Sequence, residues 1–429
     1  MNNELCAYID GKKVGTFVEN NGQITFSYVD NPSQHISLSM PASRRTHKNK
    51  SSLCYLWGLL PDNQQALANM AREAGTSANS IFGILKHHGQ DVAGALQLLP
   101  PEVTPSDANK RSLFEVSQRL SDSDLEVLLK QSMDRYHGQQ ALDASSTEAF
   151  KFSIAGAQPK IALTADSQGN FLPPSKDFAT THIIKPNDPQ SAFYFSDIDI
   201  IEVACLKAAE TLGITSSQSF LWESPSGDLK ALITRRYDRV VNEDGTISRL
   251  HQEDFCQALS VMPEKKYQHR DGGPGISDMG RLIRNSVSPA EREPILQSLF
   301  AALIFNIGIL GTDAHAKNYS LLYNAGTALA PLYDSISAAA HISGNSTAHF
   351  PMKVGNTYSF TDISTKDLVS VGQKLSLPAE YSEQKAHEIL TGIPQALLDA
   401  TATLGHPKIG EQLVDGILQL SPVRWYVSS

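Results

Sequence analysis

The sequence predicts a two-lobed α+β protein that has a small β-rich N-terminal subdomain and a mainly helical C-terminal lobe. Two observations predict this class. Short apolar runs separated by turn residues fill most of 3–40 and 148–240, as in half-buried strands, whereas longer helical patterns dominate after Gln252. A chain of 429 residues, 41% hydrophobic and 19% charged, can form two or three domains with ordinary cores. The composition therefore excludes a fibrous or wholly disordered protein.

The first hundred residues predict a β-rich domain that ends in a linker. Alternating apolar runs predict three strands, at 4–10, 14–20 and 23–29. Asn21-Gly22 between the last two is a strong hairpin signal. Helical patterns follow, at 63–71, 80–88 and 92–98. Residues 99–105 contain three prolines, which suit the interior of neither a helix nor a sheet, so we expect the N-terminal domain to span 1–104.

The remaining chain predicts a connector followed by the two parts of a core. Ser121 is a good N-cap for the helical pattern after it, so 105–147 is expected to be a helical connector. Strand patterns dominate 148–250, at 151–166, 171–174, 181–186, 217–224 and 229–238. A helix is expected over 197–212, with Gly213 as its C-cap. Residues 251–429 predict the helical lobe, with one hairpin at 319–333.

Charge and cysteine content limit the partners of the chain. The net charge of −9 argues against a direct reader of duplex DNA, because such affinity comes mainly from cations that neutralise phosphates. Its four cysteines (Cys6, Cys54, Cys205 and Cys256) form no C-x-x-C pair, which predicts neither a disulfide framework nor a zinc ribbon. The N-terminus lacks a signal-peptide pattern, and the longest apolar stretch, 299–310, is shorter than the ~20 residues of a membrane span. We expect a cytoplasmic protein that has no membrane partner.

The strongest chemical signal lies at 311–318, which reads GTDAHAKN. Asp313 and Asn318 have the D-x-x-x-x-N spacing of a protein-kinase catalytic loop, and the predicted hairpin would bring Asp334 back beside Asn318. Phosphoryl transfer needs a carboxylate that orients the attacking hydroxyl, and oxygen ligands that hold Mg²⁺ against the triphosphate. The alternative is that this run is a helix cap and Asp334 is a turn residue.

Three upstream features fit the same chemistry. The run 153–160, SIAGAQPK, has small residues that would let backbone N–H groups approach phosphates, although it is not a Walker loop and a plain hairpin turn is the alternative. Lys185 ends a β-branched strand shaped like the kinase strand whose lysine grips phosphates, and Glu202 follows early in a helix. Lys185 alone could equally be a solvated strand end. Arg235 and Tyr237 follow a strand where a kinase hinge would lie, and Tyr237 could pack on adenine or in the core.

These runs resemble those of the HipA-type serine/threonine kinase toxins of bacterial toxin–antitoxin pairs. The matching runs, in order, are SIAGAQPK (153–160), THIIKP (181–186), RRYDR (235–239), QEDFCQAL (252–259), KKY with DGGPGI (265–276), GTDAHAKN (311–318) and PLYDSISA (331–338). The resemblance implies a protein-kinase-like fold that binds ATP and Mg²⁺. It divides the core into an N-lobe-like part over 148–250 and a C-lobe over 251–429, and the first hundred residues look like the β-rich domain that precedes them in this family.

The resemblance also implies a role for each matching residue. Asp313 is the catalytic base, Asn318 and Asp334 are the Mg²⁺ ligands, and Lys185 with its partner Glu202 grips the ATP phosphates. The remaining nucleotide contacts are Ser153, Ile154, Ala155, Gly156, Ala157, Gln158, Lys160, Arg235, Tyr237 and Gln252, together with His315 and Lys317, which either approach the γ-phosphate or brace the loop. Ser153 matches the serine that such toxins autophosphorylate to silence themselves. Arg235, Tyr237 and Ala314 depart from the residues usual in the family, but no catalytic group is missing.

By this resemblance the chain would be the toxin of a type II pair. It would phosphorylate an aminoacyl-tRNA synthetase similar to glutamyl-tRNA synthetase, arrest growth and promote persistence. Its partner would be a HipB-like helix-turn-helix antitoxin dimer, and it would reach operator DNA mainly through that antitoxin as a corepressor. The basic run 44–50 is expected to be a solvated loop, with a supplementary phosphate contact as the alternative. Two other functions stay open: a small-molecule kinase of similar architecture and a non-catalytic corepressor.

Overall fold

The computed structural model describes residues 3–105, 111–137, 152, 158–190, 197–342 and 348–427. The chain forms two compact units, and it passes from one to the other three times. Unit 1 consists of Met1–Tyr194 and Phe220–Glu253, and unit 2 consists of Phe195–Ser219 and Asp254–Ser429. Helices and strands mix in both units, which confirms the predicted α+β class. The predicted domain limits at 104, 147 and 250 stay predictions of the sequence.

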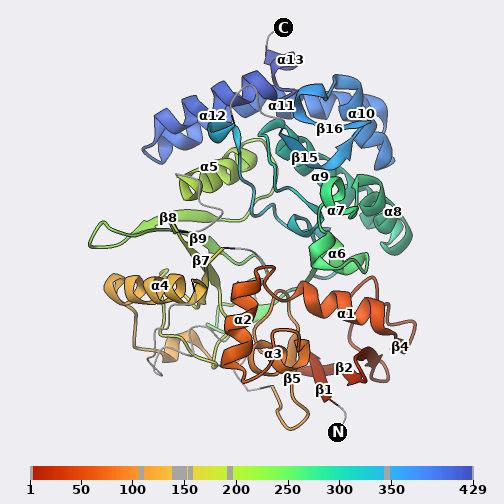
Figure 1. The fold of residues 1–429 in the computed structure, drawn as a ribbon, viewed down its shortest axis with the longest axis vertical. Helices are drawn as coiled ribbons and strands as arrows, with labels where there is room; N and C mark the ends of the chain where they lie inside the picture. The colour runs from red at the N-terminus through yellow and green to blue at the C-terminus, as the bar shows by residue number, and fades with distance from the viewer. Residues whose placement is uncertain are drawn as a thin grey trace. The chain divides into compact units, whose positions relative to one another are not determined.

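A five-stranded antiparallel sheet begins unit 1, drawn in red and orange in Figure 1. Its order is β4-β3-β2-β1-β5, and its strands are β1 (Asn3–Ile9), β2 (Lys12–Asn20), β3 (Gln23–Tyr28), β4 (Thr46–His47) and β5 (Gln97–Leu99). Asn21 and Gly22 join β2 to β3 with φ values of 49° and 74°. A two-residue hairpin turn whose twist matches that of the strands requires such positive φ values at both positions. The three predicted strands and their hairpin are therefore confirmed.

The helix predicted over 92–98 is wrong, because this segment contains strand β5. Gly94 has a φ of +82°, a conformation that ends any helix there, and Leu98 and Leu99 pair with β1 at the edge of the sheet. Sequence reasoning also missed α1 (Asn49–Gly58), which begins inside the basic run 44–50. The solvated loop expected there is wrong in part, because the run also contains β4 with buried His47. The helix α1 has apolar residues on several sides, and it therefore gives no clear one-sided pattern.

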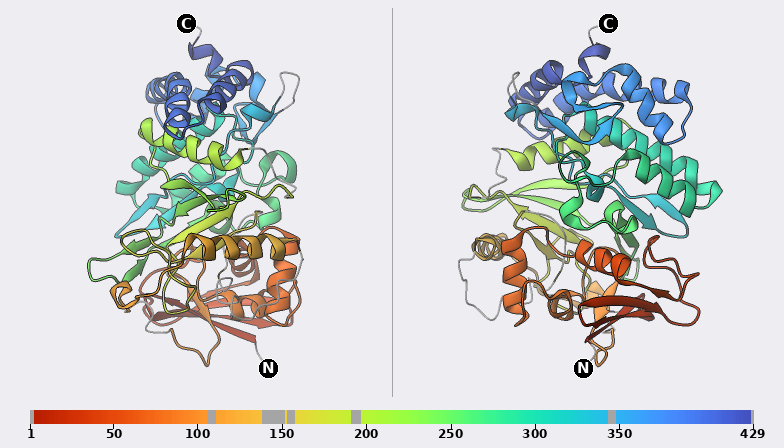
Figure 2. Two further views of the ribbon diagram at one scale, coloured as in Figure 1. Left: turned by 90° about the vertical axis from the view of Figure 1, so that its left-hand side faces the viewer. Right: turned by 45° about the vertical axis from the view of Figure 1, so that its right-hand side comes forward.

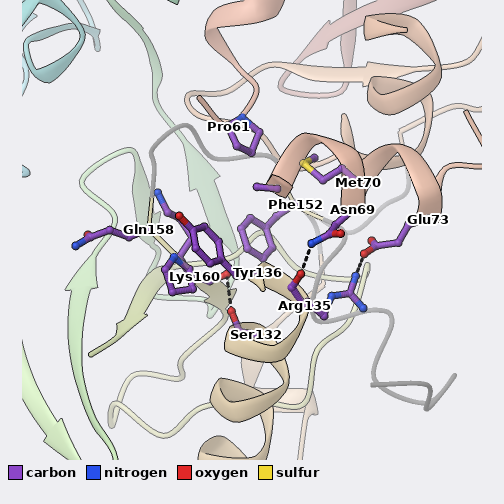
Figure 3. A pocket seen from close by; sticks show the side chains of 12 residues that line it. Pro61, Asn69, Met70, Glu73, Ser132, Arg135, Tyr136, Phe152, Gln158 and Lys160 are labelled. Atoms are coloured by element: carbon purple, nitrogen blue, oxygen red, sulfur yellow. Dashed lines mark hydrogen bonds and ion pairs between the residues drawn. The ribbon is translucent and has the colours of Figure 1, made fainter. Parts of the chain in front are cut away.

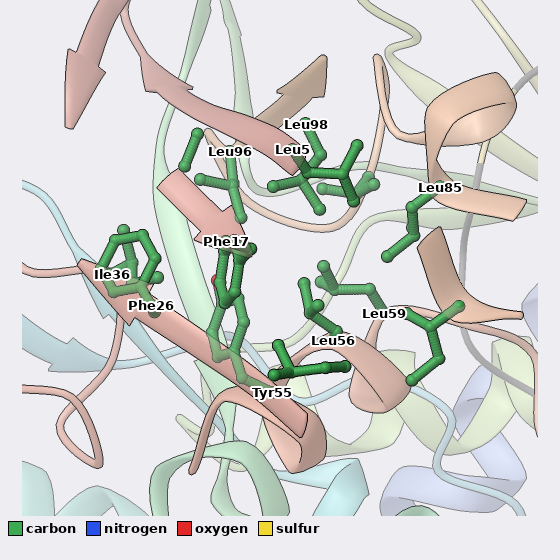
Figure 4. Packing of buried hydrophobic residues seen from close by; sticks show 14 of the residues in the cluster. Leu5, Phe17, Phe26, Ile36, Tyr55, Leu56, Leu59, Leu85, Leu96 and Leu98 are labelled. Carbon is green, nitrogen blue, oxygen red and sulfur yellow. The ribbon is translucent and has the colours of Figure 1, made fainter. Parts of the chain in front are cut away.

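The sheet and three helices enclose one hydrophobic core. Helices α1 and α3 (Ile81–His88) contact the strands, and α2 (Gln64–Glu73) packs on α3; Figure 2 draws these helices in orange. Figure 4 shows Phe17 of the sheet near both Phe26 of the same sheet and Tyr55 of α1, with ring centroids 4.5 and 6.4 Å away, and all three side chains are fully buried. The helices predicted at 63–71 and 80–88 are thus present, and their caps, Asn63 and Ser80, each accept a backbone N–H.

The second half of unit 1 contains a four-stranded sheet packed on α4 (Asp122–Tyr136). The sheet has the order β6-β7-β9-β8, with β6 at Ile161–Leu163, β7 at His182–Pro186, β9 at Lys230–Arg235 and β8 at Ser219–Glu223. Ser121 caps α4 in a capping box with Asp124, as the sequence predicts. Short elements complete the unit: η2 (Leu113–Glu115), β10 (Arg239–Val241) and β11 (Ile247–Arg249). Strand β12 (His251–Asp254) follows, and its last residue begins unit 2.

Unit 2 is mainly helical, as predicted. The long helices α9 (Pro289–Gly308) and α11 (Ala379–Thr403) form its centre, and α5 (Ile198–Thr211), α10 (Thr365–Lys374) and α12 (Pro407–Leu420) pack on α11 (Figure 1). The smaller helices are α6 (Phe255–Ala258), α7 (Gln268–Asp271), α8 (Ile276–Ser286) and α13 (Arg424–Val427). The 3₁₀ turns are η4 (Pro263–Lys265), η5 (Ala316–Asn318), η6 (Ala339–His341) and η7 (Phe360–Asp362).

Two hairpins interrupt these helices, although the sequence predicts only one. The predicted hairpin consists of β13 (Ser320–Tyr323) and β14 (Thr327–Leu329). The second consists of β15 (His349–Val354) and β16 (Thr357–Ser359), which are joined through Gly355 at a φ of +56°. Pro351 lies inside β15 and weakens its strand signal, since proline cannot donate to a ladder.

Two further expectations concern cysteines and membranes. All four cysteines are buried, and none of them forms a disulfide. Within the ranges that the structure describes, every helix is too short or too polar to cross a bilayer.

Candidate active site

The candidate catalytic loop lies in unit 2 and follows the end of α9. The last turns of α9 are fully buried, and the chain turns sharply after Gly308, with Leu310 at a φ of +59°. The N–H of Gly311 then donates to the Asn306 carbonyl at 2.8 Å. A Cβ on Gly311 would lie only 3.0 Å from that carbonyl oxygen, so glycine suits this close approach. The turn fixes where the next residues, 312–318, begin.

The loop curls around the backbone carbonyl of Asp313. The N–H of His315 and the side-chain Nδ2 of Asn318 both donate to this carbonyl, each at 2.8 Å. The two residues of the D-x-x-x-x-N spacing are thereby joined directly, and η5 completes the turn between them. The Asp313 side chain keeps 55% of its surface exposed. A carboxylate held by its backbone and open to solvent can accept a proton from an incoming hydroxyl.

Tyr267 contacts the Asp313 carboxylate, which sequence reasoning did not anticipate. Its hydroxyl donates to Asp313 Oδ1, and its ring meets the His315 ring edge-on with centroids 4.7 Å apart. The Nε2 of buried His315 lies 3.6 Å from the same oxygen. The guanidinium of Arg270 stacks over the Tyr267 ring at 4.3 Å. Tyr267 belongs to the KKY run, but nothing in that run indicates its partner.

Lys317 forms a buried ion pair inside the loop region. Its Nζ lies 3.4 Å from Oδ2 of Asp254, and their side chains are only 4% and 10% exposed. Asp254 also caps α6, because its Oδ1 accepts the N–H of Gln257 at 2.8 Å. Of the two roles left open for Lys317, this geometry favours bracing the loop. Its partner Asp254, in the QEDFCQAL run, was not predicted.

The segment that carries Asp334 is fastened to the loop by Tyr333. The Tyr333 hydroxyl donates to the Lys317 carbonyl at 2.8 Å and hydrogen-bonds the Ser320 hydroxyl at 2.7 Å. The neighbouring residue, Leu332, pairs with the strand-like residues 215–217 on its other side. These contacts bring the residues before Asn318 and Asp334 together, as the predicted hairpin would. Asp334 itself has a φ of +54° and a half-buried side chain.

A buried polar network supports both segments from behind. The Asn306 amide donates to the Tyr319 hydroxyl at 2.9 Å and accepts from the Ser335 hydroxyl at 2.7 Å. Burial raises the pKa of Tyr319 well above its ordinary value, so the hydroxyl stays protonated. One side chain of α9 therefore ties the residue after the loop to the residue after Asp334.

The donor chemistry fits a magnesium–nucleotide complex. Asn318 donates through its Nδ2, and its Oδ1 is a neutral oxygen suited to Mg²⁺. The Asp334 carboxylate supplies a charged oxygen from the adjoining segment. Mg²⁺ usually takes one or two carboxylates from a protein and its other ligands from phosphates and water. When bound, the ion would neutralise charge on the transferred phosphate.

Other predicted nucleotide contacts lie in unit 1. Lys185 is on β7 opposite Leu232 of β9, and it is half-buried. Arg235 ends β9 with an exposed side chain. The Tyr237 hydroxyl donates to Oε1 of Gln252, so these two predicted contacts do lie together. Gln252 Nε2 in turn donates to Asp238 at 3.1 Å.

The predicted phosphate loop is described only at its end. Residues 153–157, which include Ser153, Ile154, Ala155, Gly156 and Ala157, lie outside the described residues. Gln158 and Lys160 line a cavity of about 90 Å³ between α2 and α4, where the Ser132 hydroxyl donates to the Lys160 carbonyl at 3.3 Å (Figure 3). Glu202 is buried on α5 in unit 2, and Lys185 is in unit 1, so their pairing stays a prediction.

Comparison with known proteins agrees with these runs. The model of the HipA N-terminal domain matches residues 5–99, and that of the HipA-like C-terminal domain matches residues 152–400. Y4mE of Sinorhizobium fredii, which is named as a kinase, is 33% identical over 414 residues, 93% of this chain and 90% of that protein.

Two further matches come from Shewanella oneidensis. Its serine/threonine-protein kinase toxin HipA is 25% identical over 382 residues, 86% of this chain and 81% of that protein. The solved structure of HipA in complex with HipB and operator DNA has a TM-score of 0.77 at 20% identity and covers 99% of both chains, which shows a shared fold. From the family models and the relatives together, the chain belongs to the HipA family of serine/threonine kinase toxins.

Proposed function

We propose that this chain transfers the γ-phosphate of ATP to a serine or threonine of a protein, and that it is the toxin of a type II toxin–antitoxin pair. The observation that supports this proposal best is the geometry of the loop at 311–318 in unit 2. The loop presents the Asp313 carboxylate to solvent and joins Asp313 to Asn318, while Tyr333 fastens the Asp334 segment to the same loop. A kinase needs a base and two metal ligands held in this way.

Each residue of the loop then has a task that its contacts support. Asp313 accepts the proton of the attacking hydroxyl and orients it toward the phosphate. Tyr267 and His315 hold the carboxylate, and Lys317 braces the loop through Asp254. Asn318 and Asp334 would hold Mg²⁺, and Lys185 with Glu202 would hold the ATP phosphates. Positioning of this kind supplies most of the catalysis in phosphoryl transfer.

The proposal also covers the protein substrate, the binding partner and the regulation of the kinase. We propose an aminoacyl-tRNA synthetase as substrate, a HipB-like antitoxin as partner and operator DNA as a target reached through that partner. The relative from Shewanella oneidensis, whose structure contains HipB and operator DNA, supports the partner. Autophosphorylation of Ser153 would silence the enzyme, because a phosphoserine adds about −1.5 to −2 charge that the ATP phosphates repel.

Phosphate incorporation from labelled ATP tests the assignment. We expect Asp313→Asn and Asp334→Asn each to lower incorporation by at least about 100-fold, since each removes a charge that acts on the reacting groups. Asp415→Asn, which changes an exposed carboxylate on α12, is the matched control and should retain full activity. Wild-type rates in Asp313→Asn would sink the assignment.

Two further measurements separate the alternatives. Mass spectrometry after the reaction should find phosphate on a protein substrate and on Ser153; phosphate only on small molecules would identify a small-molecule kinase. Lys185→Ala should lose toxicity. If Lys185→Ala and the wild type are equally inactive as kinases but repress an operator equally well, the chain is a non-catalytic corepressor.

A further inference from the structure

A second cavity in unit 1 has a cationic lining, and no step of the proposed kinase reaction uses it. It measures about 170 Å³ and lies between the end of α3, strand β6, the loop 174–180 and the end of β11. Its charged side chains are Lys86, Lys176 and Arg249 against the single carboxylate of Asp91, a net lining charge of +2 before His87 is counted. A water molecule occupies about 30 Å³ of liquid volume, so the cavity has room for a small polyatomic ion.

Arg249 is the buried anchor of this cavity. Its side chain is 3% exposed, and its Nε is buried without a hydrogen-bond partner among the described residues. Its other nitrogens make long contacts, at 3.4 Å to the Gln90 carbonyl and at 3.6 Å to Asp91. Burial is the main reason why the pKa of Arg249 is lowered to about 10; Asp91 opposes this shift, whereas Arg239 and Arg236 add to it. A buried guanidinium is costly, and an anion in the adjoining cavity would lower that cost through its charge.

Asp91 does not satisfy Arg249, because other groups already use its oxygens. One oxygen accepts from Arg239 at 2.8 Å, and the other accepts from the Thr180 hydroxyl at 2.6 Å and its N–H at 3.1 Å. Behind it, Asp238 pairs with Arg236 and Arg239 at 2.9 and 3.0 Å. The three arginines therefore face two buried carboxylates, and the exposed Asp10 is a third acid near Arg249.

The exposed lysines complete the donor set at the mouth. Lys86 lies in the last turn of α3 and Lys176 lies in the loop opposite, and both are exposed. The Gln90 side chain donates to the Lys176 carbonyl at 3.2 Å, which ties the two walls together. A planar guanidinium inside and two ammonium groups outside are the donors that proteins use for phosphate.

We propose that this cavity is a binding site for a phosphate dianion, either inorganic phosphate or a phosphate monoester. The charge of a dianion matches the net lining charge of +2, and Arg249 contributes a buried cation to that lining. The site is independent of the catalytic loop, since every residue that lines it belongs to unit 1.

Calorimetric titration of the full chain with inorganic phosphate tests the site. Ionic strength is held constant, and a saturating non-hydrolysable ATP analogue fills any nucleotide site. We expect one phosphate per chain, and about tenfold or weaker binding in the Lys86→Ala/Lys176→Ala double variant, because charge-assisted hydrogen bonds are lost. Lys13→Ala, an exposed lysine of β2, is the matched control and should bind as the wild type does. Arg249 belongs to a buried ionic cluster, and replacing it could unfold unit 1. The test therefore uses variants of the two exposed lysines.

Thermal unfolding supplies a second readout. Phosphate should raise the Tm of the wild type and of Lys13→Ala but not that of the double variant, because a ligand of the native state stabilises it by mass action. The Asp313→Asn variant should respond as the dephosphorylated wild type does, which separates this site from the kinase assignment. No phosphate binding to the dephosphorylated protein at millimolar concentration, or equal binding in the double variant and in Lys13→Ala, would overturn the proposal.

The Ser153→Ala variant distinguishes two sources of the bound phosphate: a phosphorylated Ser153 and a free ion or metabolite. If the site accepts the phosphate of a modified Ser153, protein phosphorylated there should not bind inorganic phosphate, whereas Ser153→Ala should. If the site serves a free ion or metabolite, both proteins should bind it equally. Either result supports the site and assigns its ligand, and failure of both to bind excludes it.

Discussion

Tyr267 shows what one side chain adds to the candidate base. Its hydroxyl donates to Asp313, and its ring packs against His315, so it orients the carboxylate from one side. We predict that Tyr267→Phe lowers kcat by roughly 3- to 10-fold and leaves the KM for ATP unchanged, because a hydrogen bond to a charged group is lost at a half-exposed site. Tyr267→Ala should lower kcat further, since the ring contact is lost too. Steady-state kinetics checks both, and an unchanged kcat in Tyr267→Ala would show that the contact has no positioning role.

At the scale of single residues, the sequence predicts which side chains belong to the candidate site but not which side chains they contact. The D-x-x-x-x-N spacing is short, so it predicts that Asp313 and Asn318 share one turn, and the structure joins them through a hydrogen bond. Lys317 and Asp254 are separated by sixty-two intervening residues, and only the fold brings them to 3.4 Å. Spacing carries no information about such a pair, and the same holds for Tyr267.

At the scale of elements, helix α12 packs closely on η6, which follows the Asp334 segment, and a glycine makes this contact possible. Gly416 of α12 lies so close to η6 that a Cβ there would overlap the Ala339 carbonyl oxygen, a backbone atom that cannot rotate away. Gly392 of α11 faces only the end of the flexible Leu212 side chain. We predict that Gly416→Ala lowers the free energy of unfolding by about 1–3 kcal/mol through overpacking. Gly392→Ala should be neutral or stabilising by up to about 1 kcal/mol, because alanine is the better helix former.

Urea unfolding of the two alanine variants provides the comparison. If Gly416→Ala were as stable as Gly392→Ala, the close packing of α12 on η6 would be wrong. Activity measured in parallel should fall only for Gly416→Ala, since η6 follows the Asp334 segment within a few residues.

Elements whose sequence signals are local were predicted correctly, whereas elements that depend on distant contacts were missed. The hairpin at Asn21-Gly22 and the helix after Ser121 were predicted correctly, because both signals lie within a few residues of the element. The strand β5 and helix α1 were missed, because the first is defined by pairing with distant β1 and the second by packing on the N-terminal sheet. Tertiary contacts override local propensity at such places.

At the scale of whole units, the ionic core of unit 1 predicts sensitivity to acid. Burial lowers the pKa of His251 to about 4, with its ring nitrogen donating to the Ile36 carbonyl at 2.9 Å, whereas the unfolded value is about 6.5. Burial alone would raise the pKa of Asp238, but Arg236 and Arg239 lower it to about 2. Both folded values lie below the unfolded ones, so these groups stabilise the native state at neutral pH. Their contribution is lost as the pH falls, first through 6.5 to 4 and then toward 2.

We predict that His251→Gln flattens the pH dependence of stability between pH 6.5 and 4. Glutamine keeps a donor for the Ile36 carbonyl but takes up no proton, whereas the wild type loses on the order of 3 kcal/mol over this range. Urea unfolding at a series of pH values measures the slope. The loss below pH 4 should remain in the variant, because Asp238 is unchanged; identical slopes in both proteins above pH 4 would exclude His251 as the cause.

The charge of the whole chain governs how it would reach DNA. With a net charge of −9 it can neutralise few phosphates, and the basic run 44–50 is partly compensated, since Arg45 pairs with Asp30 at 2.8 Å. We predict that the chain alone gives no band shift on operator DNA at concentrations where the proposed HipB-like antitoxin binds, and that adding the chain to the antitoxin–DNA complex gives a slower band. The dependence of log K on log salt should keep the slope of the antitoxin alone, because each added phosphate contact would steepen it by about 0.9. A slope steeper by several such steps would instead show direct contact with DNA, and alanines at Arg44, Arg45, Lys48 and Lys50 would then restore the antitoxin value.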